Sequence, residues 1–155
     1  IYFEDSIHFV HVLLKLNDSF VKFNYKIIMS KIKILFQVLN VIFIILYVYP
    51  GSILGYFLYR DSTVQPQITG DFLVSSNHVY AFLVLSLIGL FAYYKSSKVI
   101  ILNYLILISI ILEVLHLVIP NRSFEYRDLF GNIVGVFLSI LLISIFNFWR
   151  KDEHI

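Results

Sequence analysis

The sequence predicts an all-α fold, a polytopic membrane protein built as a bundle of four transmembrane helices. Apolar residues make up 59% of the 155 residues and charged residues only 14%, against roughly 45–50% and about 25% in soluble domains. Mean hydropathy is +0.85. The apolar residues form long uncharged runs rather than alternating patterns, so they are expected to face lipid.

The first predicted span covers residues 34–49, and no charge appears between its basic start and Arg60. A basic start is also typical of a signal peptide, but no small-residue cleavage site follows, which favours an uncleaved anchor. Pro50 and Gly51 then end or kink the helix. Residues 51–59 remain apolar and aromatic, which indicates a place at the membrane interface or at the mouth of the bundle.

The longest polar stretch, residues 60–77, is a predicted loop. Three further spans are predicted, at residues 78–94, 99–119 and 129–149. The third span has the length of about 20 residues that a bilayer crossing needs. A short basic turn follows the second span, and a polar loop follows the third.

The only methionine, Met29, is followed by two lysines and then by a hydrophobic run, as at a natural N-terminus. This pattern favours residues 1–28 as an upstream, non-native extension and residues 29–155 as the membrane domain. The alternative is that residues 1–28 form an interfacial amphipathic segment.

The distribution of Lys and Arg predicts the orientation in the membrane. With four crossings, one side carries Lys31, Lys33, Lys95, Lys98, Arg150 and Lys151, and the other carries Arg60, Arg122 and Arg127. This excess predicts that both termini are cytoplasmic and that the loops 60–77 and 121–128 face outward. The net charge of +2 is too small to indicate a nucleic-acid partner, and the absence of cysteine excludes disulfides and thiolate metal sites.

Several polar residues lie in or beside the predicted spans, and the most informative is Glu113. It is the only acidic or basic residue inside a long hydrophobic run, where a charge costs roughly 2.5–3.5 kcal/mol. His116, three positions later, shares its helical face. The outer ends of the second and fourth spans add more polar groups. The predicted outward-facing pocket consists of His78, Glu113, His116, Arg122, Asp128 and Asn132.

Each of these residues also has a purely structural interpretation. Glu113 could pair with Arg122, or it could be protonated and hydrogen bonded between helices. Asp128 is a suitable N-cap for the fourth span. Gly131 and Gly135 form a G-x-x-x-G pattern, which predicts close helix packing.

The sequence predicts no metal ion and no other cofactor. His116 beside Glu113 lacks the second spaced motif that a metal site in a helical bundle needs. The motifs G-x-S-x-G, Walker A, G-x-G-x-x-G and H-E-x-x-H are absent, so soluble-enzyme catalysis has no support. Whether the protein is a membrane enzyme stays open.

Three short patterns follow one another in the second half of the chain: Glu113-x-x-His116, Pro120-Asn-Arg122, and Asp128 followed by Asn132-x-x-Gly135. They resemble the VanZ-like family of small bacterial membrane proteins, whose pattern is Glu-x-x-Gln, Pro-Gly-Arg, Asp and Asn-x-x-Gly. His78 before an apolar helix resembles the Asp-Lys-x-x-His-Phe start of the family's second helix. The chain departs from the family pattern at five positions. His116 stands where the family has Gln, and Asn121 stands where it has Gly. Val74 and Ser75 replace the Asp and Lys before the histidine, and Ser139 replaces a second Gly.

The resemblance covers roughly residues 31–151 and implies a multi-pass protein of the bacterial cytoplasmic membrane with a role at the cell envelope. The family's named member is associated with low-level resistance to teicoplanin, a lipid-tailed glycopeptide. No reaction is implied.

Three functions follow as expectations. The first is binding of an amphiphilic or anionic envelope molecule, such as a lipid-linked precursor or a lipoglycopeptide, with Arg122 pairing to a phosphate or carboxylate. The second is a membrane enzyme acting on a lipid-linked substrate, with Glu113 or His116 as acid or base. The third is a small proton-coupled transporter that uses Glu113 and forms a homodimer, with Gly131 and Gly135 as a candidate interface. Membrane lipid is an expected partner in every case.

Overall fold

The computed structural model describes residues 2–71 and 73–152, and the side chains of residues 19–71 and 73–149. These described residues form five helices: α1 (Tyr2–Val48), α2 (Ile53–Tyr59), α3 (Ser76–Tyr93), α4 (Lys98–Leu115) and α5 (Tyr126–Asp152). Four segments within them are long and apolar enough to cross a membrane: Ser19–Val48, Ser76–Tyr93, Lys98–Leu115 and Tyr126–Trp149. The predicted fold class, an all-α polytopic membrane protein with four transmembrane helices, is therefore confirmed.

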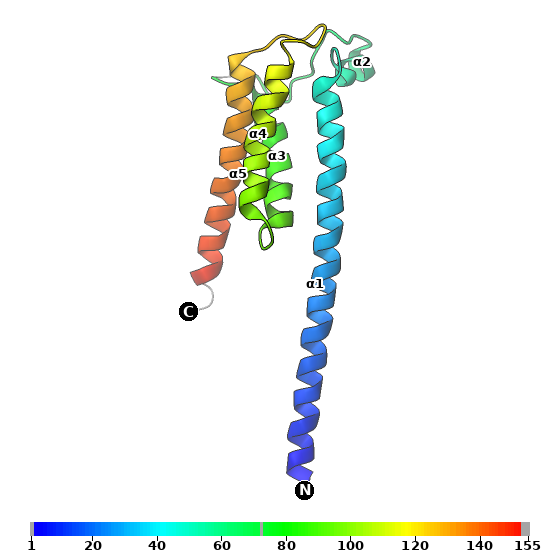
Figure 1. Ribbon diagram of the computed structural model, residues 1–155, viewed down its shortest axis with the longest axis vertical. Coiled ribbons are helices and arrows are strands. Elements are labelled where there is room, and N and C mark those ends of the chain that lie inside the picture. Colours follow the sequence, from blue (N-terminus) through cyan, green and yellow to red (C-terminus); the bar gives the residue numbers. More distant parts are fainter. Residues whose placement is uncertain (1, 72, 153–155) are drawn as a thin grey trace.

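The four long helices lie side by side in alternating directions (Figure 1). The α3–α4 turn lies at the same end as the C-terminal end of α5, whereas α2 and the α4–α5 connection lie at the opposite end. Helix α5 packs mainly along α3 and also contacts α4, and α1 contacts α3 and α4. The N-terminal part of α1 continues well past the ends of the other helices.

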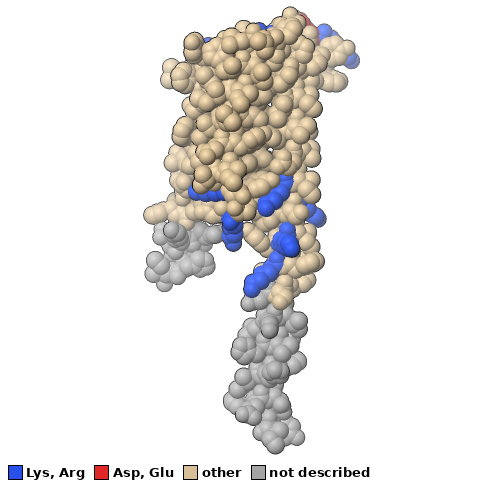
Figure 2. All heavy atoms as spheres, viewed as in Figure 1, with Lys and Arg blue, Asp and Glu red and all other residues tan. Residues whose placement is uncertain are grey.

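Charged side chains mark the ends of the bundle. Figure 2 shows a broad band without Lys, Arg, Asp or Glu, with Lys and Arg gathered below it. At this lower end, Lys33 lies 5.0 Å from the centre of the Tyr93 ring, and Lys98 lies 5.2 Å from that of Tyr94. Aromatic rings with basic partners are typical of the headgroup region of a membrane. Which end faces the cytoplasm stays a prediction.

Two glycines form the close contact between α5 and α3. A Cβ atom added to Gly131 would lie 2.8 Å from the carbonyl oxygen of Ser75, and one added to Gly135 would lie 2.6 Å from that of Val79. The two backbones can approach this closely because no side chain separates them. The G-x-x-x-G surface of α5 is thus covered by α3 of the same chain. A homodimer stays a prediction and would need another surface.

Helix α4 ends at Leu115, earlier than the predicted residue 119. Three successive N–H groups, beginning with that of His116, bond to carbonyls three residues earlier at 3.0–3.1 Å, the tighter pattern of a 3₁₀ turn. Pro120 then has no N–H to continue the helix. Asn121 has a φ of 59°, a left-handed conformation that asparagine and glycine adopt more readily than other residues. This turn leads the chain back across the end of the bundle.

Met29 lies inside α1, and the helix continues through it without a break. The predicted boundary between residues 28 and 29 is therefore not a boundary of secondary structure, and the start of the native chain stays a prediction. Whether the segment is amphipathic depends in large part on residues 1–18, whose side chains lie outside the described residues.

Helix α2 and the following loop cover one end of the groove between α1 and α3. The Ser52 hydroxyl caps α2 by accepting the N–H of Gly55 at 2.9 Å. A Cβ atom on Gly55 would lie 1.8 Å from the carbonyl oxygen of Val64, so the loop lies directly against the helix. This short helix is the predicted apolar segment at the mouth of the bundle.

Candidate polar and amphiphile-binding site

Six polar side chains gather where α1 and α4 end and where α3 and α5 begin. The cluster consists of Tyr47, His78, Glu113, His116, Asp128 and Asn132. Glu113 and Asn132 have an exposed fraction of 0%, His116 of 3% and His78 of 5%. Five of the six predicted pocket residues are thus brought together from three helices and the turn after α4, and Arg122 lies beside them.

His78 lies at the centre of this cluster. Its Nδ1 atom is 2.9 Å from the Oδ1 atom of Asn132 and 3.0 Å from the hydroxyl of Tyr47. The Asn132 amide group donates to the carbonyl of Ser109 at 3.1 Å, which sets its orientation. Because an amide oxygen can only accept, Nδ1 of His78 carries a proton. The other ring nitrogen, Nε2, faces the Oδ2 atom of Asp128 at 3.2 Å.

His116 is held in the same manner. Its Nε2 atom lies 3.1 Å from the backbone oxygen of Tyr47, which can only accept, so Nε2 is the donor. Its Nδ1 atom faces the Oε2 atom of Glu113 at 3.3 Å, within ion-pair distance but without the alignment of a hydrogen bond. The cluster therefore contains two histidine–carboxylate pairs. In each pair, a proton or a metal ion must lie between the ring nitrogen and the carboxylate oxygen.

Arg122 forms no ion pair with Glu113 among the described residues, so the suggested pairing is not present. Its guanidinium donates to three neutral oxygens: the carbonyls of Leu46 at 3.3 Å and Tyr49 at 3.2 Å, and the Gln65 side chain at 3.3 Å. The last carbonyls of a helix lack partners within the helix, and the C-terminal end of the helix dipole favours cations. Arg122 thus caps α1.

The charge of Arg122 persists although the side chain is half-buried. Burial lowers the pKa of its guanidinium from the ordinary value, and the negative charges of Glu113 and Asp128 oppose this effect. A guanidinium is effectively always protonated in proteins. The end of α1 therefore carries a permanent cation.

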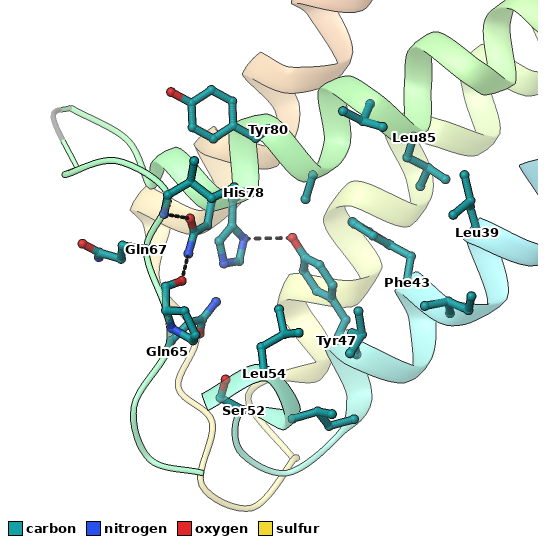
Figure 3. A pocket seen from close by; sticks show the side chains of 18 of the residues that line it. Leu39, Phe43, Tyr47, Ser52, Leu54, Gln65, Gln67, His78, Tyr80 and Leu85 are labelled. Atoms are coloured by element: carbon teal, nitrogen blue, oxygen red, sulfur yellow. Dashed lines mark hydrogen bonds between the residues drawn. The ribbon is translucent and has the colours of Figure 1, made fainter. Parts of the chain in front are cut away.

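A cavity of about 620 Å³ lies between α1 and α3, next to the polar cluster (Figure 3). Its apolar walls include Leu39, Phe43 and Leu46 of α1, Ala81, Val84 and Leu85 of α3, and Leu54 and Leu58 of α2. Its polar end includes Ser52, Gln65, His78, His116 and Arg122. The cavity is bordered by Ile42, Leu54 and Val84, whose exposed fractions are 47%, 54% and 53%. Exposed apolar residues of this kind face lipid in a membrane protein, so the cavity opens toward the bilayer.

The sequence pointed to most of the cluster but not to Tyr47. This residue lies in an uncharged run where aromatic side chains are common. Its hydroxyl donates to Asn132 at 2.9 Å, and its ring stacks on that of His116 with centroids 5.9 Å apart. The only available signal was its place near the end of a span, which Tyr also occupies for reasons of lipid anchoring.

Substituting Tyr47→Phe tests the cluster with little change of shape. The variant keeps the ring and the backbone carbonyl but loses the hydrogen bond from the hydroxyl to Asn132. The free energy of unfolding should therefore fall by about 1 kcal/mol. Thermal unfolding in detergent micelles measures this. Tyr56→Phe, on the exposed surface of α2, should leave the melting temperature unchanged. Equal shifts in the two variants would contradict the buried hydrogen bond.

No protein-family model, curated protein or solved structure matches this chain. The similarity to VanZ-like proteins stays an expectation based on the motif residues.

Proposed function

We propose that the chain binds an amphiphilic, anionic molecule of the cell envelope, with its apolar part between α1 and α3 and its anionic group at Arg122. One observation carries the proposal. An apolar cavity of about 620 Å³ ends at a guanidinium whose hydrogen bonds, within the described part of the chain, go to neutral oxygens. Ligand cavities of about 300–1,000 Å³ typically combine apolar walls with a few polar groups.

The apolar part of the cavity suits a hydrocarbon chain. Its wall on α1 runs from Leu39 to Leu46, a length of about 10 Å at 1.5 Å per residue. The groove follows the helix axis, so a bound chain keeps the direction that it has in the bilayer. Since the opening faces lipid, a molecule can reach the cavity without leaving the membrane.

The polar end suits an anion. The hydrogen bonds of Arg122 to its three neutral acceptors measure 3.2–3.3 Å, whereas bonds between a cationic N–H group and an anionic oxygen are shorter, about 2.7–2.9 Å. The forked guanidinium also matches a phosphate or a carboxylate. An anionic headgroup is therefore a better partner for Arg122 than the carbonyls that it contacts here.

The cellular setting is part of the same proposal. The excess of Lys and Arg at one end favours cytoplasmic termini and an outward-facing polar end. The VanZ-like motif residues favour the bacterial cytoplasmic membrane. A lipid-linked cell-wall precursor or a lipoglycopeptide such as teicoplanin combines the required tail and polar group.

The proposal is tested by titrating the protein in detergent micelles with a fluorescently labelled decyl phosphate. Wild-type protein should bind it saturably. Ala81→Phe fills the cavity, and Arg122→Gln removes the cation. Each should weaken binding by at least about tenfold, or ~1.4 kcal/mol.

Arg60→Gln is the matched control, because Arg60 is exposed on the same end of the bundle and does not line the cavity. Ala81→Phe leaves the cap of α1 intact, so it separates loss of binding from loss of structure. The proposal fails if a neutral decyl glycoside competes as well as decyl phosphate, or if Ala81→Phe binds the probe like wild type.

A further inference from the structure

We infer that His78, Glu113 and Asp128 bind a divalent transition-metal ion of the zinc class, with His116 available as a fourth ligand. One donor atom from each of the first three residues lies within 4.8 Å of the other two. Ligand atoms at about 2.0–2.2 Å from a tetrahedral ion are about 3.4 Å apart, so the most distant of these donor atoms must move closer by up to about 1.4 Å when the ion binds. This inference needs neither the cavity nor its occupant and thus goes beyond the proposed amphiphile binding.

Both histidines present a lone pair in the form that a metal ion requires. The Nδ1–H of His78 is held by the Asn132 oxygen, which leaves Nε2 as the ligand atom. The Nε2–H of His116 is held by the Tyr47 carbonyl, which leaves Nδ1. A metal-binding histidine usually donates its other N–H to a fixed oxygen, which sets the tautomer and the orientation of the ring. Asn132 is itself fixed by its bond to Ser109.

The two free lone pairs face carboxylates. Nε2 of His78 lies 3.2 Å from Oδ2 of Asp128, and Nδ1 of His116 lies 3.3 Å from Oε2 of Glu113. Electron-rich atoms at this separation repel each other unless a cation lies between them. Neighbouring ligand atoms of a tetrahedral zinc ion are about 3.4 Å apart, nearly the same separation.

One oxygen of Glu113 supports this assignment independently. Oε1 accepts the N–H of Glu125 at 3.0 Å, but the fully buried Oε2 has no aligned hydrogen-bond partner in the described part of the chain. It points into the cluster, 4.0 Å from Nδ1 of His78. Leaving a carboxylate oxygen without a partner inside a membrane is costly. A bound cation would remove that cost.

The donor set selects the metal. Two imidazoles with two carboxylates match Zn²⁺ best and suit Mn²⁺ or Fe²⁺ less specifically, whereas Ca²⁺ and Mg²⁺ prefer oxygen ligands alone. The sequence predicted no metal because Glu113 and His116 had no second spaced motif. The other two ligands lie in separate helices, His78 in the first turn of α3 and Asp128 in the first turn of α5, so they form no motif in the sequence.

Zinc titration of the purified full-length chain, without a polyhistidine tag and after treatment with a chelator, tests this site. A background variant with His8, His11 and His154 replaced by asparagine removes the other histidines of the sequence. We expect one Zn²⁺ per chain, and Co²⁺ should produce the visible absorption of a tetrahedral nitrogen and oxygen site. Asp128→Asn, nearly identical in shape, should weaken Zn²⁺ binding by at least about tenfold.

Asp61→Asn is the matched control. Asp61 is an exposed carboxylate of the loop after α2, and hydrogen bonds from Thr63 hold its pKa below the ordinary value, so it is ionised at neutral pH. Its substitution should leave zinc binding unchanged. Size-exclusion chromatography before metal addition verifies the fold, and His78→Gln serves as the second variant if Asp128→Asn does not fold.

Two outcomes overturn the inference. If the background variant binds no zinc, the two histidine–carboxylate pairs hold protons only. If it binds zinc equally well after His78→Gln or Asp128→Asn, the metal lies elsewhere. Arg122→Gln separates this inference from the proposed function, since it should lose the decyl phosphate probe and keep zinc.

Discussion

Replacing Gly135 by alanine is expected to destabilise the bundle by about 1–3 kcal/mol, although alanine is the better helix former by about 1 kcal/mol. The new Cβ atom would lie 2.6 Å from the carbonyl oxygen of Val79 and 2.8 Å from the backbone nitrogen of Leu83. Both atoms belong to the backbone of α3, which cannot rotate aside as a side chain can. The two helices must separate, and the contacts along their interface weaken. The sign of the change therefore distinguishes packing from helix propensity.

Thermal unfolding in detergent micelles, followed by circular dichroism, measures this effect. Gly70→Ala is the control, because a Cβ atom at Gly70 would meet no atom within 4 Å. Gly131→Ala should behave like Gly135→Ala, since its Cβ would lie 2.8 Å from the carbonyl oxygen of Ser75. A melting temperature of Gly135→Ala at or above that of wild type would contradict the close approach of α3 and α5.

Asn132→Leu is expected to lower the free energy of unfolding by about 2–4 kcal/mol, even though leucine is the more favourable residue in lipid. Asn132 is fully buried and contacts His78, Tyr47 and Ser109. Leucine would leave the His78 N–H, the Tyr47 hydroxyl and the Ser109 carbonyl without this partner. Each buried polar group that loses its partner costs about 1–3 kcal/mol, and part of this is recovered when the cluster rearranges.

Asn103→Leu provides the comparison within the same protein. Asn103 is exposed on α4, so the substitution replaces a polar group on the lipid-facing surface and should be neutral or stabilising. Thermal unfolding of both variants in the same micelles gives the difference directly. If Asn132→Leu melts at the temperature of Asn103→Leu, the hydrogen-bonded cluster does not contribute to stability.

The sequence predicts the crossings well but their ends less well. A long run of apolar residues without a charge indicates that a segment crosses the bilayer, and this signal identified all four spans. Helix ends depend on contacts from other parts of the chain. His116 caps α4 while its ring bonds to the carbonyl of Tyr47, and no local pattern reveals such a partner. The apolar run to residue 119 therefore overestimated the length of α4.

The same distinction applies to the site. Glu113, His116 and Asn132 stand out in a sequence because polar groups inside a membrane require a reason. Tyr47 does not, since tyrosine is ordinary at the ends of spans. The partners of Arg122 could not be predicted at all, because two of them are backbone carbonyls, which carry no sequence signal.

The unequal attachment of the helices has a consequence for motion. Helix α5 is joined to α3 by the contact of backbone against backbone at Gly131 and Gly135, whereas α1 is held by side chains of α3 and α4 and by the cap from Arg122. A transmembrane helix satisfies its own backbone hydrogen bonds, so α1 can shift as a rigid rod without breaking them. We therefore expect α1 to shift more readily than the pair formed by α3 and α5. The width of the cavity is then expected to vary on the microsecond to millisecond timescale of rigid-helix motion, which would let the proposed site admit tails of different bulk.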